Sequence, residues 1–198
     1  RSAPETSATA SPVAAVGTSS AASVRGANTR TMSSHRFLRL GCDGTRTVVG
    51  AEQDPWTDKE IEDAHSRIRD LAGDPARGEK ITEAGLDEAA VALTAENLHV
   101  FPRLEREKTG GAEFKAPDGS SWDVKSPLSP PPNQNWYYSP HHHLDKVRKD
   151  LDQGDNVFLN LTRVTEQDRD ATLDLFSQEL SCDEKGRILI LSDAPIQG

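Results

Sequence analysis

Two short apolar runs near the C-terminal end constrain the fold of this chain most. Residues 156–161 (NVFLNL) and 187–192 (RILILS) are continuous apolar stretches of strand length, typical of strands that are covered on both faces. Between them, Thr165 caps a segment whose apolar residues recur at helical spacing up to Leu180. A strand, a helix and a strand in this order predict a parallel crossover, so we expect a sheet flanked by helices.

Helix start and stop signals place three further helices. Residues 57–60 (TDKE) form a capping box, and Gly73 ends the helix that follows. A second helix is predicted at about 82–97. Ser139-Pro140 provides an N-cap and a first helical position for a third helix, which ends at Gly154.

The pattern between the second and third helices is that of strands. Residues 98–102, 112–116 and 122–126 are predicted strands, and the last two are joined by the turn sequence PDGSS at 117–121. The proline-rich stretch 126–140 cannot belong to a central strand and is predicted as a loop. We therefore predict an α/β (α+β) fold, in which an antiparallel hairpin meander is followed by parallel crossovers in one mixed sheet.

Composition divides the chain into three parts. Residues 1–34 are rich in Ala, Ser and Thr without an apolar period, and with only 34 % hydrophobic residues overall we expect them to be a disordered linker. Residues 35–79 are predicted to be an N-terminal extension with a hairpin and one helix, and residues 80–198 to be the core. The chain begins at Arg1 and its single methionine is Met32, so we expect a piece of a longer protein or a processed product.

Charge and cysteine content limit the function classes. A formal net charge of -9 disfavours a general nucleic-acid binder, since phosphate contacts favour Lys and Arg, although local basic patches can override it. Cys42 and Cys182 show no zinc-site spacing and form either one disulfide or two free thiols. No apolar run approaches the length of a membrane span, so we expect no membrane segment.

The candidate chemistry lies on the predicted hairpin. Asp123 and Lys125 share one face of their strand because alternate residues do so. The turn at 117–121 brings Glu113 near Asp123, and two converging carboxylates repel unless a cation lies between them. Oxygen ligands suit Mg²⁺ or Mn²⁺. Lys125 beside such a metal would orient the attacking water or neutralise charge on a phosphoryl transition state.

At these residues the chain resembles the PD-(D/E)xK, restriction-endonuclease-like nuclease superfamily. The closest likeness is to the C-terminal tRNase and DNase domains of contact-dependent inhibition and related bacterial polymorphic toxins. It is carried by DEAAVAL at 87–93, GAEF at 111–114 and DVKSP at 123–127. The resemblance implies a restriction-endonuclease-like sheet and a catalytic set, with Glu113 and Asp123 as metal ligands. That set consists of Glu88, Glu113, Asp123 and Lys125. An aspartate is usual where Glu113 stands, which leaves the details of coordination open.

Other interpretations of the same residues remain. Glu113-Phe114-Lys115 is itself an E-x-K, for which Glu105 or Glu107 would supply the first acid. Taken singly, Asp123 and Lys125 also fit a solvated strand face, and Glu88 an exposed helix face. Substrate contacts are predicted at polar residues of the loop and helix after the motif: Gln134, His141, His142, Lys146 and Lys149.

Structural interpretations also exist for the residues of this loop and helix. His141 to His143 fit an exposed polar turn as well as a phosphate contact at a helix start. Lys146, Arg148 and Lys149 fit a solvated helix face as well as a phosphate track. The loop aromatics Trp136, Tyr137 and Tyr138 either stack bases or cover one end of the sheet.

The function that follows from the resemblance is a metal-dependent nuclease toxin domain. It would be bacterial, secreted or delivered as part of a larger effector, and would cleave tRNA or DNA in the cytoplasm of a competing cell. A cognate immunity protein is the expected partner. The alternatives are a non-catalytic binding module with the same fold and a phage or mobile-element DNA-processing nuclease.

Overall fold

A computed structural model describes residues 35–50, 57–75 and 78–193; the predicted linker 1–34 lies outside this range. The helices and strands, in chain order, are β1 (Arg36–Leu40), β2 (Arg46–Val49), α1 (Asp58–Ala72), β3 (Gly73–Asp74), β4 (Lys80–Ile81), α2 (Glu83–Asn97), β5 (Glu105–Arg106), β6 (Phe114–Lys115), β7 (Ser121–Lys125), α3 (Pro140–Gln153), β8 (Asn156–Asn160), α4 (Glu166–Glu179), α5 (Cys182–Gly186) and β9 (Ile188–Ser192).

Seven strands form one mixed sheet in the order β2-β1-β9-β8-β7-β6-β5. The meander β5-β6-β7 is antiparallel, β7-β8-β9 are parallel, and β1 joins β9 antiparallel. This confirms the predicted mixed sheet with a meander followed by parallel crossovers. The hairpin β1–β2, assigned above to an N-terminal extension, belongs to this same sheet, and β3 and β4 form a separate two-stranded sheet.

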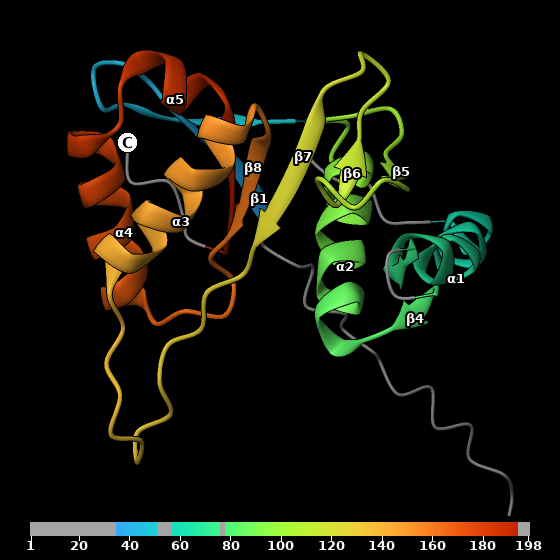
Figure 1. Cartoon of the computed structure of the whole chain (residues 1–198), viewed down its shortest axis with the longest axis horizontal. Coiled ribbons are helices and arrows are strands. Elements are labelled where there is room, and N and C mark those ends of the chain that lie inside the picture. The colour runs from blue at the N-terminus through green and yellow to red at the C-terminus, as the bar shows by residue number, and fades with distance from the viewer. Residues whose placement is uncertain (1–34, 51–56, 76–77, 194–198) are drawn as a thin grey trace, which may run out of the picture. The chain divides into compact units, whose positions relative to one another are not determined.

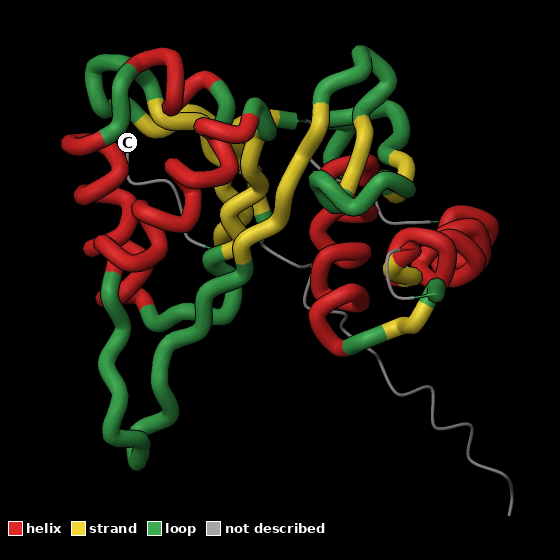
Figure 2. Tube along the Cα trace, in the orientation of Figure 1, coloured by secondary structure: helices red, strands yellow, loops and turns green. Residues whose placement is uncertain are grey.

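Helices cover both faces of the large sheet (Figures 1 and 2). The helices α1 and α2 pack on one face, over a layer of buried strand side chains that consists of Phe37, Phe114, Trp122, Val124, Phe158, Leu189 and Leu191. The helices α3 and α4 pack on the other face, over Leu38, Leu40, Val157, Leu159, Ile188 and Ile190. Strands that are apolar on both faces therefore occupy the centre of the sheet, as the two apolar runs predicted.

Local signals in the sequence set the helix ends. The side chain of Thr57 accepts from the backbone N–H of Glu60, and the side chain of Glu60 accepts from the backbone N–H of Thr57, which is the predicted capping box. Gly154 ends α3 in the left-handed conformation. A Cβ at Gly85 would lie 2.4 Å from the carbonyl oxygen of Ala72, so the absence of a side chain there lets α2 approach the end of α1.

The predicted strand at 98–102 is wrong. Leu98 caps α2, His99 has φ +54, and the N–H of Val100 donates to the carbonyl of Ala95. The carboxylate of Glu96 then accepts from the N–H of Leu104 at 2.6 Å. These bonds fold the apolar run around the end of the helix, and the strand of the meander begins later, at β5.

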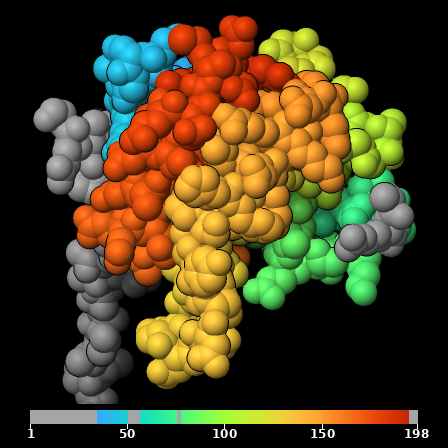
Figure 3. Space-filling model, turned by 60° about the vertical axis from the view of Figure 1, so that its left-hand side comes forward, coloured from blue at the N-terminus to red at the C-terminus, as the bar shows by residue number. Residues whose placement is uncertain are grey.

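The proline-rich stretch 126–139 between β7 and α3 is the predicted loop. It projects away from the sheet and helices in both ribbon views (Figures 1 and 2) and stands out on the surface in Figure 3. Within residues 35–50, 57–75 and 78–193, no helix combines the length and the hydrophobicity of a membrane span.

Candidate active site

Strand β7 carries the motif at its carboxyl end. Trp122 and Val124 are buried against the layer under α1 and α2. Asp123 and Lys125 therefore face the opposite side, toward α3. Asp123 is 8 % exposed and lies among the buried polar residues, so it does not belong to a solvated strand face.

Glu113 lies directly across from Asp123. The register of β6 and β7 pairs Phe114 with Trp122, and one step further along the antiparallel pair sets Glu113 opposite Asp123. Because β6 begins only at Phe114, Val124 lies beyond the paired part of β6 and β7. Its N–H donates instead to Oε2 of Glu113 at 2.9 Å. The carboxyls of Glu113 and Asp123 also share a hydrogen bond. The structure thus brings together the two predicted metal carboxylates.

Glu113 holds a proton at neutral pH. Burial, followed by the hydrogen bond to Asp123 and the negative charges of Asp123 and Glu88, raises the pKa of Glu113 to about 8. The bond from the Val124 N–H acts in the opposite direction but is outweighed. The two adjacent carboxyls therefore carry one negative charge between them rather than two.

Lys125 closes the cluster from the same strand. Its ammonium forms ion pairs with Asp123 and, at 2.8 Å, with Oδ2 of Asp150. Burial alone would lower the pKa of Lys125, but the hydrogen bonds to Asp123 and Asp150 outweigh it and raise the pKa. Lys125 is consequently a fixed cation beside the carboxyl pair.

Asp150 is a site residue that the sequence analysis missed. It lies on α3, is 6 % exposed, and is the second carboxylate that holds Lys125. Its position three residues after Val147 places it on the same buried stripe of the helix. The signal for Asp150 in the sequence is a charged residue on the apolar stripe of a predicted helix.

Glu88 occupies the predicted position on the preceding helix but is already paired. Its Oε2 accepts from Nη1 of Arg106 at 2.7 Å, and both side chains are largely buried. Arg106 also lies over the ring of Phe114, at 5.4 Å from the centroid. Glu88 therefore contributes negative charge near Glu113, whereas Arg106, which the sequence analysis did not single out, holds it in place.

The rival E-x-K register has a different geometry. Lys115 is exposed and pairs with Glu107 at 3.0 Å rather than with Glu113. Hydrogen bonds from the backbone N–H of Thr109 and from the side chain of Lys115 lower the pKa of Glu107 to about 2, so Glu107 is ionised and ion-paired with Lys115 on the hairpin β5–β6. Glu105 is exposed. The carboxyls that converge are those of Glu113 and Asp123.

The donor set has the chemistry of an oxygen-liganded metal site but is small. Among the described residues, no group of three or more His, Cys, Asp or Glu side chains is arranged to hold a metal ion. Glu113 and Asp123 supply two carboxyls that share one proton, and a divalent cation would relieve the same repulsion that the proton relieves now. Two carboxylates suffice for Mg²⁺, which usually keeps several of its waters.

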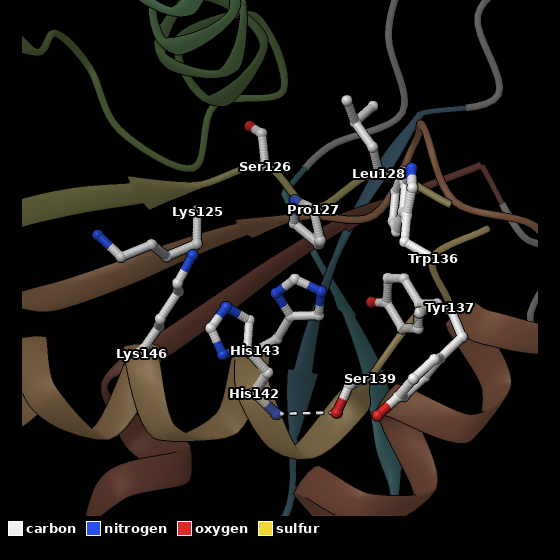
Figure 4. A pocket seen from close by; sticks show the side chains of 11 residues that line it. Lys125, Ser126, Pro127, Leu128, Trp136, Tyr137, Ser139, His142, His143 and Lys146 are labelled. Carbon is white, nitrogen blue, oxygen red and sulfur yellow. Dashed lines mark hydrogen bonds between the residues drawn. The ribbon is translucent and has the colours of Figure 1, made fainter. Parts of the chain in front are cut away.

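A pocket of about 630 Å³ opens beside Lys125 (Figure 4). It lies between the end of β7, the proline-rich loop and the start of α3. Its lining residues are Lys125, Ser126, Pro127, Leu128, Trp136, Tyr137, Tyr138, Ser139, His142, His143 and Lys146.

Two of the five predicted substrate residues, His142 and Lys146, line this pocket. His141 and Lys149 are exposed on α3 but lie outside the lining, and so does Gln134 in the loop. Arg148, considered with the lysines above, donates instead to the carboxylate of Glu184 and to the carbonyl of Glu179, and so links α3 to α5 and to the end of α4.

A second, smaller pocket of about 360 Å³ lies on the other side of β7. Glu88 and Val124 line it, together with residues at the start of α2. Ser126 and Leu128 line both pockets, which therefore meet where β7 ends. Lys125 lines the larger pocket and Glu88 the smaller one, whereas Glu113, Asp123 and Asp150 line neither. Both pockets lie at the carboxyl end of a parallel strand, where ligands bind in α/β sheets. Comparisons of the chain with protein-family models, with curated proteins and with solved structures found no match.

Proposed function

We propose that this chain carries a metal-dependent nuclease core whose site is built on Glu113, Asp123 and Lys125. The observation that carries the proposal is the pairing of a buried carboxyl with a half-buried, protonated one, directly beside a half-buried ammonium. Buried acids with strongly shifted pKa values next to a specific charge partner are characteristic of functional sites. The pockets lined by Lys125 and by Glu88 give a substrate room beside the cluster.

The proposed cofactor is Mg²⁺ or Mn²⁺, held by the carboxylates of Glu113 and Asp123. Such an ion, when bound, supplies charge neutralisation and a more acidic water for attack on phosphorus. For this to happen Glu113 must release its proton, while the N–H of Val124 keeps its carboxylate oriented.

In the proposed mechanism Lys125 remains an ammonium throughout. Asp150 fixes it from α3, so that its positive charge is directed at the phosphoryl group that develops negative charge in the transition state. Glu88, held by Arg106, keeps additional negative charge near the cluster, which favours a bound cation.

The proposed biological role is a toxin domain, delivered by a larger effector into a competing bacterium and neutralised by an immunity protein. It rests on the likeness of residues 87–93, 111–114 and 123–127 to polymorphic-toxin nucleases. Expression of the chain should arrest growth, and co-expression of the product of a neighbouring gene should relieve the arrest. Growth that continues while active nuclease accumulates would contradict the toxin role and leave the nuclease proposal standing.

The nuclease proposal is tested by incubating the protein with total RNA and with plasmid DNA, with and without Mg²⁺. Asp123→Asn and Lys125→Met should abolish cleavage with circular dichroism unchanged. Lys115→Met is the matched control, since Lys115 is the lysine of the rival register and lies on the exposed outer hairpin. Cleavage at the wild-type rate by both site variants would rule the assignment out.

A further inference from the structure

The pocket beside Lys125 has two chemically different ends. Figure 4 shows the side chains of Lys125 and Lys146 entering from one side, and those of Leu128, Trp136 and Tyr137 from the other. Its volume of about 630 Å³ falls within the range of roughly 300–1,000 Å³ typical of small-molecule sites. A ligand that fills it must therefore combine an anionic part with a flat apolar part.

The aromatic end of the pocket is exposed. Tyr137 is 85 % exposed and Trp136 47 % exposed, and Leu128 beside them is 42 % exposed. Large exposed apolar groups gathered at the mouth of a pocket mark a contact site, whereas scattered ones need no explanation. A nucleobase offers the flat face that such side chains stack on.

The wall between the two ends is fixed and uncharged. The hydroxyl of Tyr138 is hydrogen-bonded to Oγ1 of Thr172 at 2.9 Å, and its ring packs on that of His143 at 4.7 Å between centroids. Burial, followed by the positive charges of His142 and Lys146, lowers the pKa of His143 to about 4. A neutral imidazole there can donate to and accept from the edge of a base.

The cationic end lies next to the proposed scissile site. Lys125 is ion-paired with Asp123 and Asp150, whereas Lys146 has no carboxylate partner among the described residues. A phosphate at this end would satisfy Lys146 and would place the adjoining phosphodiester beside Lys125.

We propose that this pocket binds one unstacked nucleobase with its adjoining phosphate, so that the substrate of the site is single-stranded nucleic acid. The inference rests on the proposed function for the nature of the ligand. A base within a continuous duplex is stacked on both faces and cannot meet Trp136 and Tyr137 without first paying the energy of flipping out. A single strand presents such bases without that cost.

The test is binding in EDTA, which does not depend on catalysis. Fluorescence anisotropy is measured with a fluorescein-labelled 12-nucleotide single strand, as DNA and as RNA, and with the matching blunt duplexes. The wild-type protein should bind a single strand at least about tenfold more tightly than its duplex. Trp136→Ala/Tyr137→Ala should weaken single-strand binding by about tenfold or more, since stacking on one base contributes that much.

Matched variants separate the pocket from general charge and exposure. Lys146→Ala should weaken single-strand binding several-fold. Lys149→Ala, one turn further along α3 and outside the pocket, and Ile81→Ala, a similarly exposed apolar residue on β4, should leave it within about twofold. Both loop residues are exposed, so the double variant should keep the wild-type circular dichroism spectrum.

Duplex binding as tight as single-strand binding, or no effect of the Trp136 and Tyr137 substitutions, would overturn the inference. So would the absence of any binding. A protein that binds single strands through Trp136 and Tyr137 but cleaves nothing in Mg²⁺ would refute the nuclease proposal and support the pocket assignment.

Discussion

The ammonium of Lys125, on β7, lies 2.8 Å from Oδ2 of Asp150, on α3, and the aspartate is 6 % exposed. This ion pair directly links the strand that carries the motif to the helix that lines the pocket. Because Asp123 occupies the other side of the ammonium, Lys125 is held between two carboxylates from two different elements.

Asp150→Asn should change the titration of Lys125 as well as the rate. Burial lowers the pKa of Lys125, and the carboxylates of Asp123 and Asp150 raise it. Without the carboxylate of Asp150 the effect of burial is less opposed, so the pKa of Lys125 should fall. Since the protonated ammonium is the proposed active form, the alkaline limb of the pH–rate profile should move to lower pH. The rate should also fall about 10–100-fold, as for other residues that orient a ligand or catalytic group.

Asp152→Asn is the matched control, because Asp152 is on the same helix but exposed. It should leave both the rate and the pH profile unchanged. If Asp150→Asn lowered only the thermal stability, with the profile in place, Asp150 would be a structural residue and not a positioning one.

The raised pKa of Glu113 makes stability depend on pH in the direction opposite to that of a carboxylate whose pKa is lowered by an ion pair. The pKa is raised from 4.5 to about 8, so between these values the folded chain binds more protons than the unfolded chain. The free energy of unfolding should therefore fall as pH rises from about 4.5 to 8, by no more than about 1.4 kcal/mol per pH unit from this group.

Glu113→Gln mimics the protonated form, so this contribution to the slope should disappear. The variant should be more stable than the wild type at pH 8.5 and close to it at pH 5. Urea unfolding at pH 5, 6.5 and 8.5 measures the difference. If the difference in unfolding free energy between the variant and the wild type were the same at all three pH values, Glu113 would titrate normally in the folded state.

Metal binding should displace the same proton. At pH 7 Glu113 is mostly protonated, so each Mn²⁺ ion that binds to Glu113 and Asp123 should release roughly one proton. Calorimetric titration at pH 7 in two buffers of different protonation enthalpy measures this release, which should vanish near pH 9.5. Glu113→Gln should abolish the binding, whereas Glu105→Gln, at the exposed acid of the rival register, should retain it. Equal Mn²⁺ affinity in wild type and Glu113→Gln would place the metal elsewhere.

Short-range signals in the sequence predicted most of the fold, because the interactions that set helix ends and strand positions are local. The capping box at Thr57 and the left-handed Gly154 act within one helical turn. The run at 156–161 is apolar on both faces only because helices cover both sides of β8. The run at 98–102 is not a strand because its apolar residues pack around the end of α2, where the N–H of Leu104 donates to the side chain of Glu96, eight residues earlier.

The same division applies to the site. Asp123, Lys125 and Glu113 could be grouped from the sequence because one tight turn fixes their register. Asp150 and Arg106 could not, because their contacts with Lys125 and Glu88 depend on how α3 and α2 settle on the sheet. The sequence also does not decide whether Cys42 and Cys182 pair, since they are 140 positions apart and only the finished sheet brings them together.

The disulfide between Cys42 and Cys182 links the turn after β1 to the start of α5. Both residues are exposed, so replacing them with serine removes the cross-link without opening a cavity. Because the bridge closes a loop spanning 140 residues of sequence separation, Cys42→Ser/Cys182→Ser should lose about 2–5 kcal/mol of unfolding free energy. Dithiothreitol should lower the wild-type unfolding midpoint to that of the double variant and should leave the double variant itself unchanged. Equal stability of the wild type with and without the reductant would show that the two thiols are not bonded in solution.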